Sequence, residues 1–152
     1  MRRFARRRLP PDLQPAFEAF VVVVAHVERA QVALTEAMPS TRSAGLPLAE
    51  ALARFEEELD AAATAMASWR RPDVDVAWRA ADTGLREAMS RAARLRTQAP
   101  DPGGFEGLIG LIGDLLAPLE AFSGARDAFG RARRHRAGPT GEGGTHRADR
   151  TG

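Results

Sequence analysis

Residues 105–129 read FEGLIGLIGDLLAPLEAFSGARDAF, and this stretch decides the fold. Side chains at a spacing of three and four residues form one stripe along it, as expected of a helix with a single buried face. The stripe is Phe105, Leu108, Ile112, Leu115, Leu119, Phe122, Arg126 and Phe129. Pro118 is expected to kink this helix, because proline has no N–H to donate to the carbonyl of Asp114. The stretch therefore predicts one long, bent core helix.

Three further stretches carry stripes of the same spacing, and Pro- or Gly-containing loops separate them. The first stripe is Leu13, Phe17, Phe20, Val24, Val27, Gln31, Leu34 and Met38. The second runs from Leu48 to Trp69, and the third from Val74 to Leu95, with Gly84 as an interior helix-weakening residue. Together the patterns predict helices at about 12–38, 47–70, 73–98 and 102–133.

Four helices joined by short loops favour an all-α fold, an up-down-up-down antiparallel four-helix bundle spanning residues 10–134. An Arg-rich N-terminal arm (1–9) precedes the bundle, and a Gly-rich, polar, disordered C-terminal tail (135–152) follows it. A pair of long hairpins that closes only as a dimer is the alternative arrangement.

The composition restricts the chemistry and hints at the source. All 22 basic residues are Arg, and the chain has no Cys, which excludes disulfides and thiolate metal sites. Arg without Lys, beside abundant Ala, Gly and Pro, is typical of a GC-rich bacterial genome. A signal peptide is not expected, because the uncharged run between Glu18 and His26 has only seven residues, prolines separate it from the Arg-rich start, and the helical period continues beyond it. No segment has the ~20 uncharged residues of a membrane span. A cytoplasmic protein is the expectation, with a protein bound peripherally to a membrane as the alternative.

No constellation of side chains predicts catalysis, a metal or a cofactor. His26 lies off the apolar stripe, and His135 and His146 lie in or beside the tail, so no paired metal ligands form. The acidic cluster of Glu56, Glu57, Glu58 and Asp60 is interpreted as a solvated helix face, with Glu58 within reach of Arg54. The series of glycines at nearly every third position follows no predicted strand and forms no phosphate-binding loop; its members are Gly103, Gly104, Gly107, Gly110 and Gly113. The sequence predicts a non-catalytic protein with no evident small-molecule substrate.

Small residues on the back of the last helix suggest a surface for protein association. The predicted interaction face, shared by the first and last helices, is Val22, Gly107, Gly110, Gly113, Ala117 and Ala121. A low-charge face of this kind lets another chain approach closely, so an unknown protein or a second copy of this chain is the expected partner. Compositional drift toward Gly and Ala is the alternative explanation.

Basic residues are concentrated at the two ends of the chain. Residues 9–130 contain 11 Arg against 18 Asp and Glu, a net charge of −7, whereas residues 1–8 carry five Arg and no acid. In the predicted bundle, one end collects Arg2, Arg3, Arg6, Arg7, Arg8, Arg70, Arg71, Arg131, Arg133, Arg134 and Arg136. This basic pole predicts, as an alternative function, peripheral binding of nucleic acid or an anionic membrane. Two solubilising tails would give the same pattern.

Overall fold

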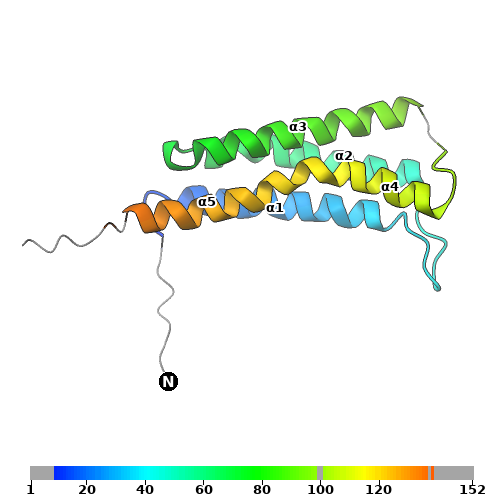
Figure 1. The fold of residues 1–152 in the computed structure, drawn as a ribbon, viewed down its shortest axis with the longest axis horizontal. Helices are drawn as coiled ribbons and strands as arrows, with labels where there is room; N and C mark the ends of the chain where they lie inside the picture. Colours follow the sequence, from blue (N-terminus) through cyan, green and yellow to red (C-terminus); the bar gives the residue numbers. More distant parts are fainter. Residues whose placement is uncertain (1–8, 99–100, 137, 139–152) are drawn as a thin grey trace, which may run out of the picture.

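The structure is a computed structural model that describes residues 9–98, 101–136 and 138, and its described part is all-helical, with four long helical segments. The predicted arm, apart from Leu9, and nearly all of the predicted tail lie outside the described residues. The elements are α1 (Gln14–Thr35), α2 (Leu48–Ala65), η1 (Met66–Trp69), η2 (Pro72–Val74), α3 (Asp75–Gln98), α4 (Phe105–Leu116), η3 (Ala117–Glu120) and α5 (Ala121–Arg136). Figure 1 shows the helices lying lengthwise beside one another.

The neighbours of each helix follow from their packing. α1 lies along α2, and α2 lies along α3. α3 in turn packs against η3 and α5 over much of its length, and against α4 at only a few points. The stretch 105–129 thus spans three elements, and α5 continues to Arg136, so that His135 and Arg136 are helical.

The predicted kink lies at Pro118, where one turn of 3₁₀-helix (η3) separates α4 from α5. The carbonyl of Asp114 would ordinarily accept the N–H of residue 118, and here it accepts a hydrogen bond from Arg91 Nη1 at 2.6 Å instead. A guanidinium from α3 therefore replaces the helical bond that proline removes.

Gly84 of α3 is required by the same kink. A Cβ atom on Gly84 would lie 2.1 Å from the carbonyl oxygen of Pro118 and 3.6 Å from the Cβ of Ala121. Real Cβ atoms do not come so close to a backbone oxygen, so only glycine lets the two backbones cross here. The residue that weakens α3 in the sequence is the one on which its packing depends.

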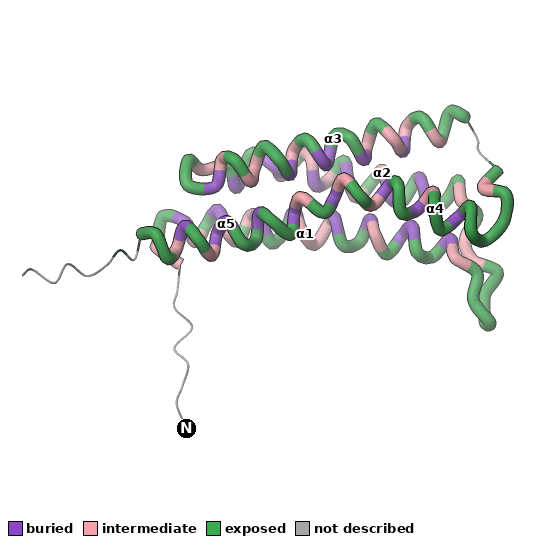
Figure 2. Tube along the Cα trace, viewed as in Figure 1, coloured by how far each residue is buried: buried purple, intermediate pink, exposed green. Residues whose placement is uncertain are grey.

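The core follows the predicted stripes with two corrections (Figure 2). On α1 the buried positions include Val23 and Ala30, whereas Val24 and Gln31, which the pattern placed at the centre, are half-buried. On the last helical stretch, Phe105 is 54% exposed, and Arg126 is also exposed. The α1 error is a rotation within a run of four similar valines, which periodicity alone cannot orient.

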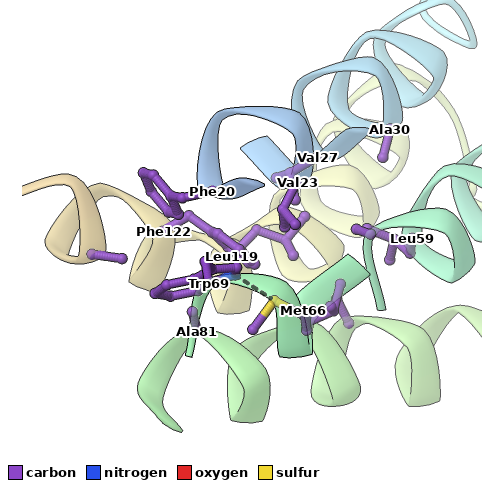
Figure 3. Packing of buried hydrophobic residues seen from close by; sticks show 14 of the residues in the cluster. Phe20, Val23, Val27, Ala30, Leu59, Met66, Trp69, Ala81, Leu119 and Phe122 are labelled. Carbon is purple, nitrogen blue, oxygen red and sulfur yellow. Dashed lines mark hydrogen bonds between the residues drawn. The ribbon is translucent and has the colours of Figure 1, made fainter. Parts of the chain in front are cut away.

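Aromatic side chains of α1, η1 and α5 gather in the core, and Figure 3 shows Phe20, Trp69 and Phe122 among them. The ring centroid of Phe20 lies 4.9 Å from that of Trp69 and 5.3 Å from that of Phe129. Phe17 and Phe129 are edge-to-face, with their ring centroids 5.4 Å apart. The buried indole N–H of Trp69 donates to Met66 Sδ at 3.4 Å. Each pair of aromatic rings adds ~0.5–1.5 kcal/mol to the stability of the fold beyond the effect of the apolar area that it buries. This part of the core is therefore firmly packed.

Candidate interaction surfaces

Exposed large apolar side chains are concentrated on two helices. Five of the six in the described residues lie on α1 and α4, and the sixth is Val76 on α3. The five are Val21, Val22, Val32, Phe105 and Ile109, with exposed fractions between 46% and 56%. Because these side chains are already about half buried, covering the rest of each is favourable by about 1 kcal/mol. A cluster of them is therefore informative, whereas a single exposed residue is not.

Helical geometry divides these five into two groups. Val22 is one turn before His26, whose Nδ1 lies 2.7 Å from Glu58 Oε2 of α2, so Val22 is on the α2 side of α1. Val21 and Val32 are eleven residues apart, which is three turns, and they share the face turned away from α2. Val21 lies three turns from Val32, so we define the α1/α4 apolar surface as Val32, Phe105 and Ile109 alone.

The orientation of α4 places Phe105 and Ile109 toward α1. Asp114 and Gly107 border α3, since Arg91 bonds the Asp114 carbonyl and a groove runs between these elements. Phe105 and Ile109 occupy the opposite flank of α4, on the far side of the buried Leu108. The sequence placed Phe105 on the core stripe and Ile109 at the edge of that stripe, so neither was predicted as part of an exposed surface. Phe105 fits the spacing of three and four residues, but this spacing does not show whether a neighbouring helix is present to cover the first turn of α4.

The small residues predicted as the interaction face do not share one surface with Val22. Gly107 and Gly110 line the groove against α3, and Ala121 is half-buried beside Gly84. Gly113 and Ala117 are exposed on the outer side of the last helical stretch. Gly107 also has a structural reason, since a Cβ there would lie 1.6 Å from the Pro102 carbonyl oxygen of the preceding loop.

The groove between the end of α3 and α4 has a volume of about 790 Å³. Its walls are Leu95, Leu111 and Leu115, with the guanidinium groups of Arg91 and Arg94 from α3. Asp101 and Asp114 balance these two positive charges in the lining. The groove has no charge preference of its own, and its walls do not converge on any reactive group.

The predicted basic pole is assembled in part by the described residues. The side chain of Arg136 contacts both Asp12 and Asp73, which brings the start of α1, η2 and the end of α5 together. Asp12 accordingly has a lowered pKa, caused first by its hydrogen bond from Arg136. Arg70 pairs with Asp75 at 3.2 Å and lies over the Trp78 ring at 4.4 Å. These arginines are largely neutralised within the fold.

The remaining described arginines of the pole differ in their partners. The guanidinium of Arg71 donates to the carbonyl of Arg70, and Arg133 has a partner of its own. Arg131 and Arg134 make no ion pair within the described residues, and both line a second groove of about 940 Å³ between the start of α3 and α5. Arg2, Arg3, Arg6, Arg7 and Arg8 lie outside the described residues. Within the described residues, the pole's positive charges without an ion pair are those of Arg131 and Arg134 on α5 and of Arg71 in the turn before η2.

A polar cluster joins α1 to α2 where the sequence placed a flank histidine. Glu58 lies 2.7 Å from His26 Nδ1 and 3.3 Å from Arg29 Nε. These hydrogen bonds, the one from His26 foremost, lower the pKa of Glu58. The suggested Glu58–Arg54 pair is wrong: Arg54 pairs with Glu50 at 3.0 Å and with Glu36 at 3.3 Å. No group of three or more acidic or histidine side chains in the described residues is placed to hold a metal ion.

Within the part of the chain that the structure describes, one helical stretch, Phe105–Arg136, is long and apolar enough to cross a membrane, by length and composition alone. In this structure its buried residues Leu108, Ile112, Leu115 and Phe129 belong to the core shared with α1, α2 and α3.

Comparison of the sequence with protein-family models found no match. Comparisons of the chain with curated proteins and with solved structures found none either.

Proposed function

We propose that the chain is an up-down-up-down antiparallel four-helix bundle that acts without catalysis, by binding another protein through the α1/α4 apolar surface. The partner we put first is a second copy of this chain. The observation that carries the proposal is the placement of Val32, Phe105 and Ile109 on adjoining flanks of two neighbouring helices, each about half exposed. Apolar side chains held in this way are stabilised when a partner covers them.

A charge placed in this surface tests the proposal. Ile109→Glu would force a carboxylate into the contact, which should weaken dimerisation by about 100-fold. Light scattering at increasing protein concentration should show a dimer for the natural chain and a monomer for the variant. The proposal would be refuted if the natural chain stays a monomer at all concentrations and, used as bait, binds no other protein that the Ile109→Glu variant fails to bind.

Val76→Glu is the matched control. Val76 is 85% exposed on α3, so the substitution introduces the same charge at an even more accessible site outside the α1/α4 apolar surface. It should leave the dimer intact. Loss of dimer in both variants would indicate a general effect of negative charge, and the assigned surface would be wrong.

Binding of a polyanion at the basic pole is the second candidate function. Arg131 and Arg134, which lack ion pairs within the described residues, are the observation that favours it. Binding to duplex DNA or to vesicles containing acidic lipid should fall steeply with added salt. The double variant Arg131→Ala/Arg134→Ala should weaken it.

Arg126→Ala removes an exposed arginine from the same helix away from the pole and is the control for this second candidate. An equal loss in Arg126→Ala would point to net charge alone. Absence of binding at low salt would exclude this second function.

A further inference from the structure

The backbone of α4 is unusually weak for a helix. Three of its 12 residues are Gly107, Gly110 and Gly113, and glycine is the least favourable helix former after proline. Packing accounts for Gly107 alone, since a Cβ on Gly110 or Gly113 would meet nothing within 4 Å. The sequence thus lowers the stability of α4 at two positions where alanine would fit.

Both ends of α4 are also poorly secured. Gly104 precedes the helix with a φ of 111° and no side-chain cap, so the first N–H groups of α4 have no side-chain acceptor at that position. At the other end, Pro118 interrupts the hydrogen-bond ladder and separates α4 from α5. The stability of α5 is therefore not passed on to α4 through a continuous helix.

Few contacts tie α4 to its neighbours. Its backbone approaches α1 and α3 at only a few points, and the groove of about 790 Å³ lies between it and α3. Among the described residues, the one side-chain hydrogen bond from another helix to α4 is that from Arg91 Nη1 to the Asp114 carbonyl, at 2.6 Å. The same guanidinium is held on α3 by Glu87 at 2.5 Å.

We infer that α4 opens by local unfolding as a separate unit, with Pro118 as its boundary and pivot, and that Arg91 is the latch that holds it closed. Opening uncovers Leu108, Ile112 and Leu115 together with the part of the core that they cover. The inference does not rest on the proposed function, because it concerns a motion of the single chain. It assigns a conformational device to the kink, the glycines and one arginine.

Native-state hydrogen exchange on the full chain, followed amide by amide by NMR at low denaturant, tests this motion. Amides of α4 should exchange through a shared opening that is at least about 10-fold more frequent than the opening of α3 and α5. If the slowest amides of α4 exchange only with global unfolding, the inference is wrong. It is equally wrong if α5 opens together with α4, because the pivot would then not be Pro118.

Substitution of the two open glycines should close α4. Each of Gly110→Ala and Gly113→Ala should slow exchange within residues 105–116 by about 5-fold, and the pair by about 25-fold. The control Gly124→Ala is in α5, where a Cβ also meets nothing within 4 Å, and it should leave α4 exchange unchanged. Unchanged α4 exchange in the double variant would contradict the inference.

Removal of the latch should have the opposite effect. Arg91→Ala deletes the bond to the Asp114 carbonyl and should speed exchange in α4 by about 10-fold, while the start of α3 is unaffected. Arg86→Ala is the matched control, since Arg86 pairs with Asp82 four residues earlier on α3 at 2.9 Å and reaches no other helix. Equal effects of the two variants on α4 would show that Arg91 is not a latch.

Discussion

Single residues at the crossing of α3 with the last helical stretch carry more structural weight than their chemistry suggests. Gly84 has no side chain, yet the backbone of Pro118 comes close enough to exclude any other residue. Arg91 is an ordinary surface arginine by sequence, and in the structure it replaces a missing backbone hydrogen bond. Neither role can be inferred from periodicity, because both depend on which turns of two distant segments meet.

Substitution of Gly84 should therefore be costly although alanine is the better helix former. Gly84→Ala would gain about 1 kcal/mol from helix propensity and lose more from the clash with the Pro118 oxygen, for a net destabilisation of about 2 kcal/mol. Urea unfolding measures the difference. The control Gly124→Ala meets nothing within 4 Å and should be neutral or stabilising. A stabilised Gly84→Ala would mean that the two backbones do not cross so closely.

At the scale of the helices, the sequence was most informative where the apolar residues differ from their neighbours. The stripe predicted for the second helix is confirmed from Leu52 of α2 to Trp69 of η1, because every predicted position between them is buried. On α1 the predictions for Leu13, Phe20, Val27 and Leu34 are confirmed, whereas Val23 is buried in place of Val24 and Ala30 in place of Gln31. Periodicity could not choose between Val23 and Val24, because Val21 to Val24 are chemically alike. The kink at Pro118 was predicted and is confirmed, since proline acts locally.

The candidate surfaces were less predictable than the helices. Val22 and the glycine face were predicted from a helical wheel for each helix and from the expected neighbourhood of the first and last helices, whereas exposure depends on how those helices are rotated against each other. Ile109 and Val32 became candidates only when the flanks of α1 and α4 could be assigned. A helical wheel gives the direction of a side chain relative to the axis of its own helix. It does not show which neighbouring helix, if any, covers that side chain.

The two halves of the last helical stretch should differ in their contribution to stability. Phe129 of α5 is 1% exposed and contacts three other aromatic rings, whereas Leu108 of α4 is 9% exposed. Phe129→Ala should reduce the free energy of unfolding by about 4 kcal/mol, and Leu108→Ala by about 2 kcal/mol. Thermal and urea unfolding check both. Similar losses at the two sites would contradict the contrast between a firmly packed end and a loose one.

For the molecule as a whole, two carboxylates link stability to acid pH. The pKa of Glu58 lies below its ordinary value of 4.5, and that of Asp12 below 3.8, because both accept hydrogen bonds from cations or imidazole. The unfolded chain therefore takes up protons first as pH falls. The stability from these pairs is fully present above about pH 5 and is lost as pH falls through the lowered values.

Unfolding measured between pH 6 and pH 3 should show this loss. Glu58→Gln should be less stable than the natural chain at pH 6 and should lose less stability on acidification. Glu57→Gln is the control, because Glu57 is exposed and makes no ion pair within the described residues. Parallel pH profiles for the natural chain and Glu58→Gln would show that the contact with His26 and Arg29 does not matter energetically.

The crossing of Gly84 with Pro118 also limits how this sequence can vary. A side chain at position 84 fits only if the carbonyl of residue 118 moves away. That carbonyl stays in place as long as proline bends the helix at position 118. The two positions are therefore expected to be inherited as a pair. In any natural or designed variant of this chain, replacing one of them should be tolerated best when the other is replaced as well.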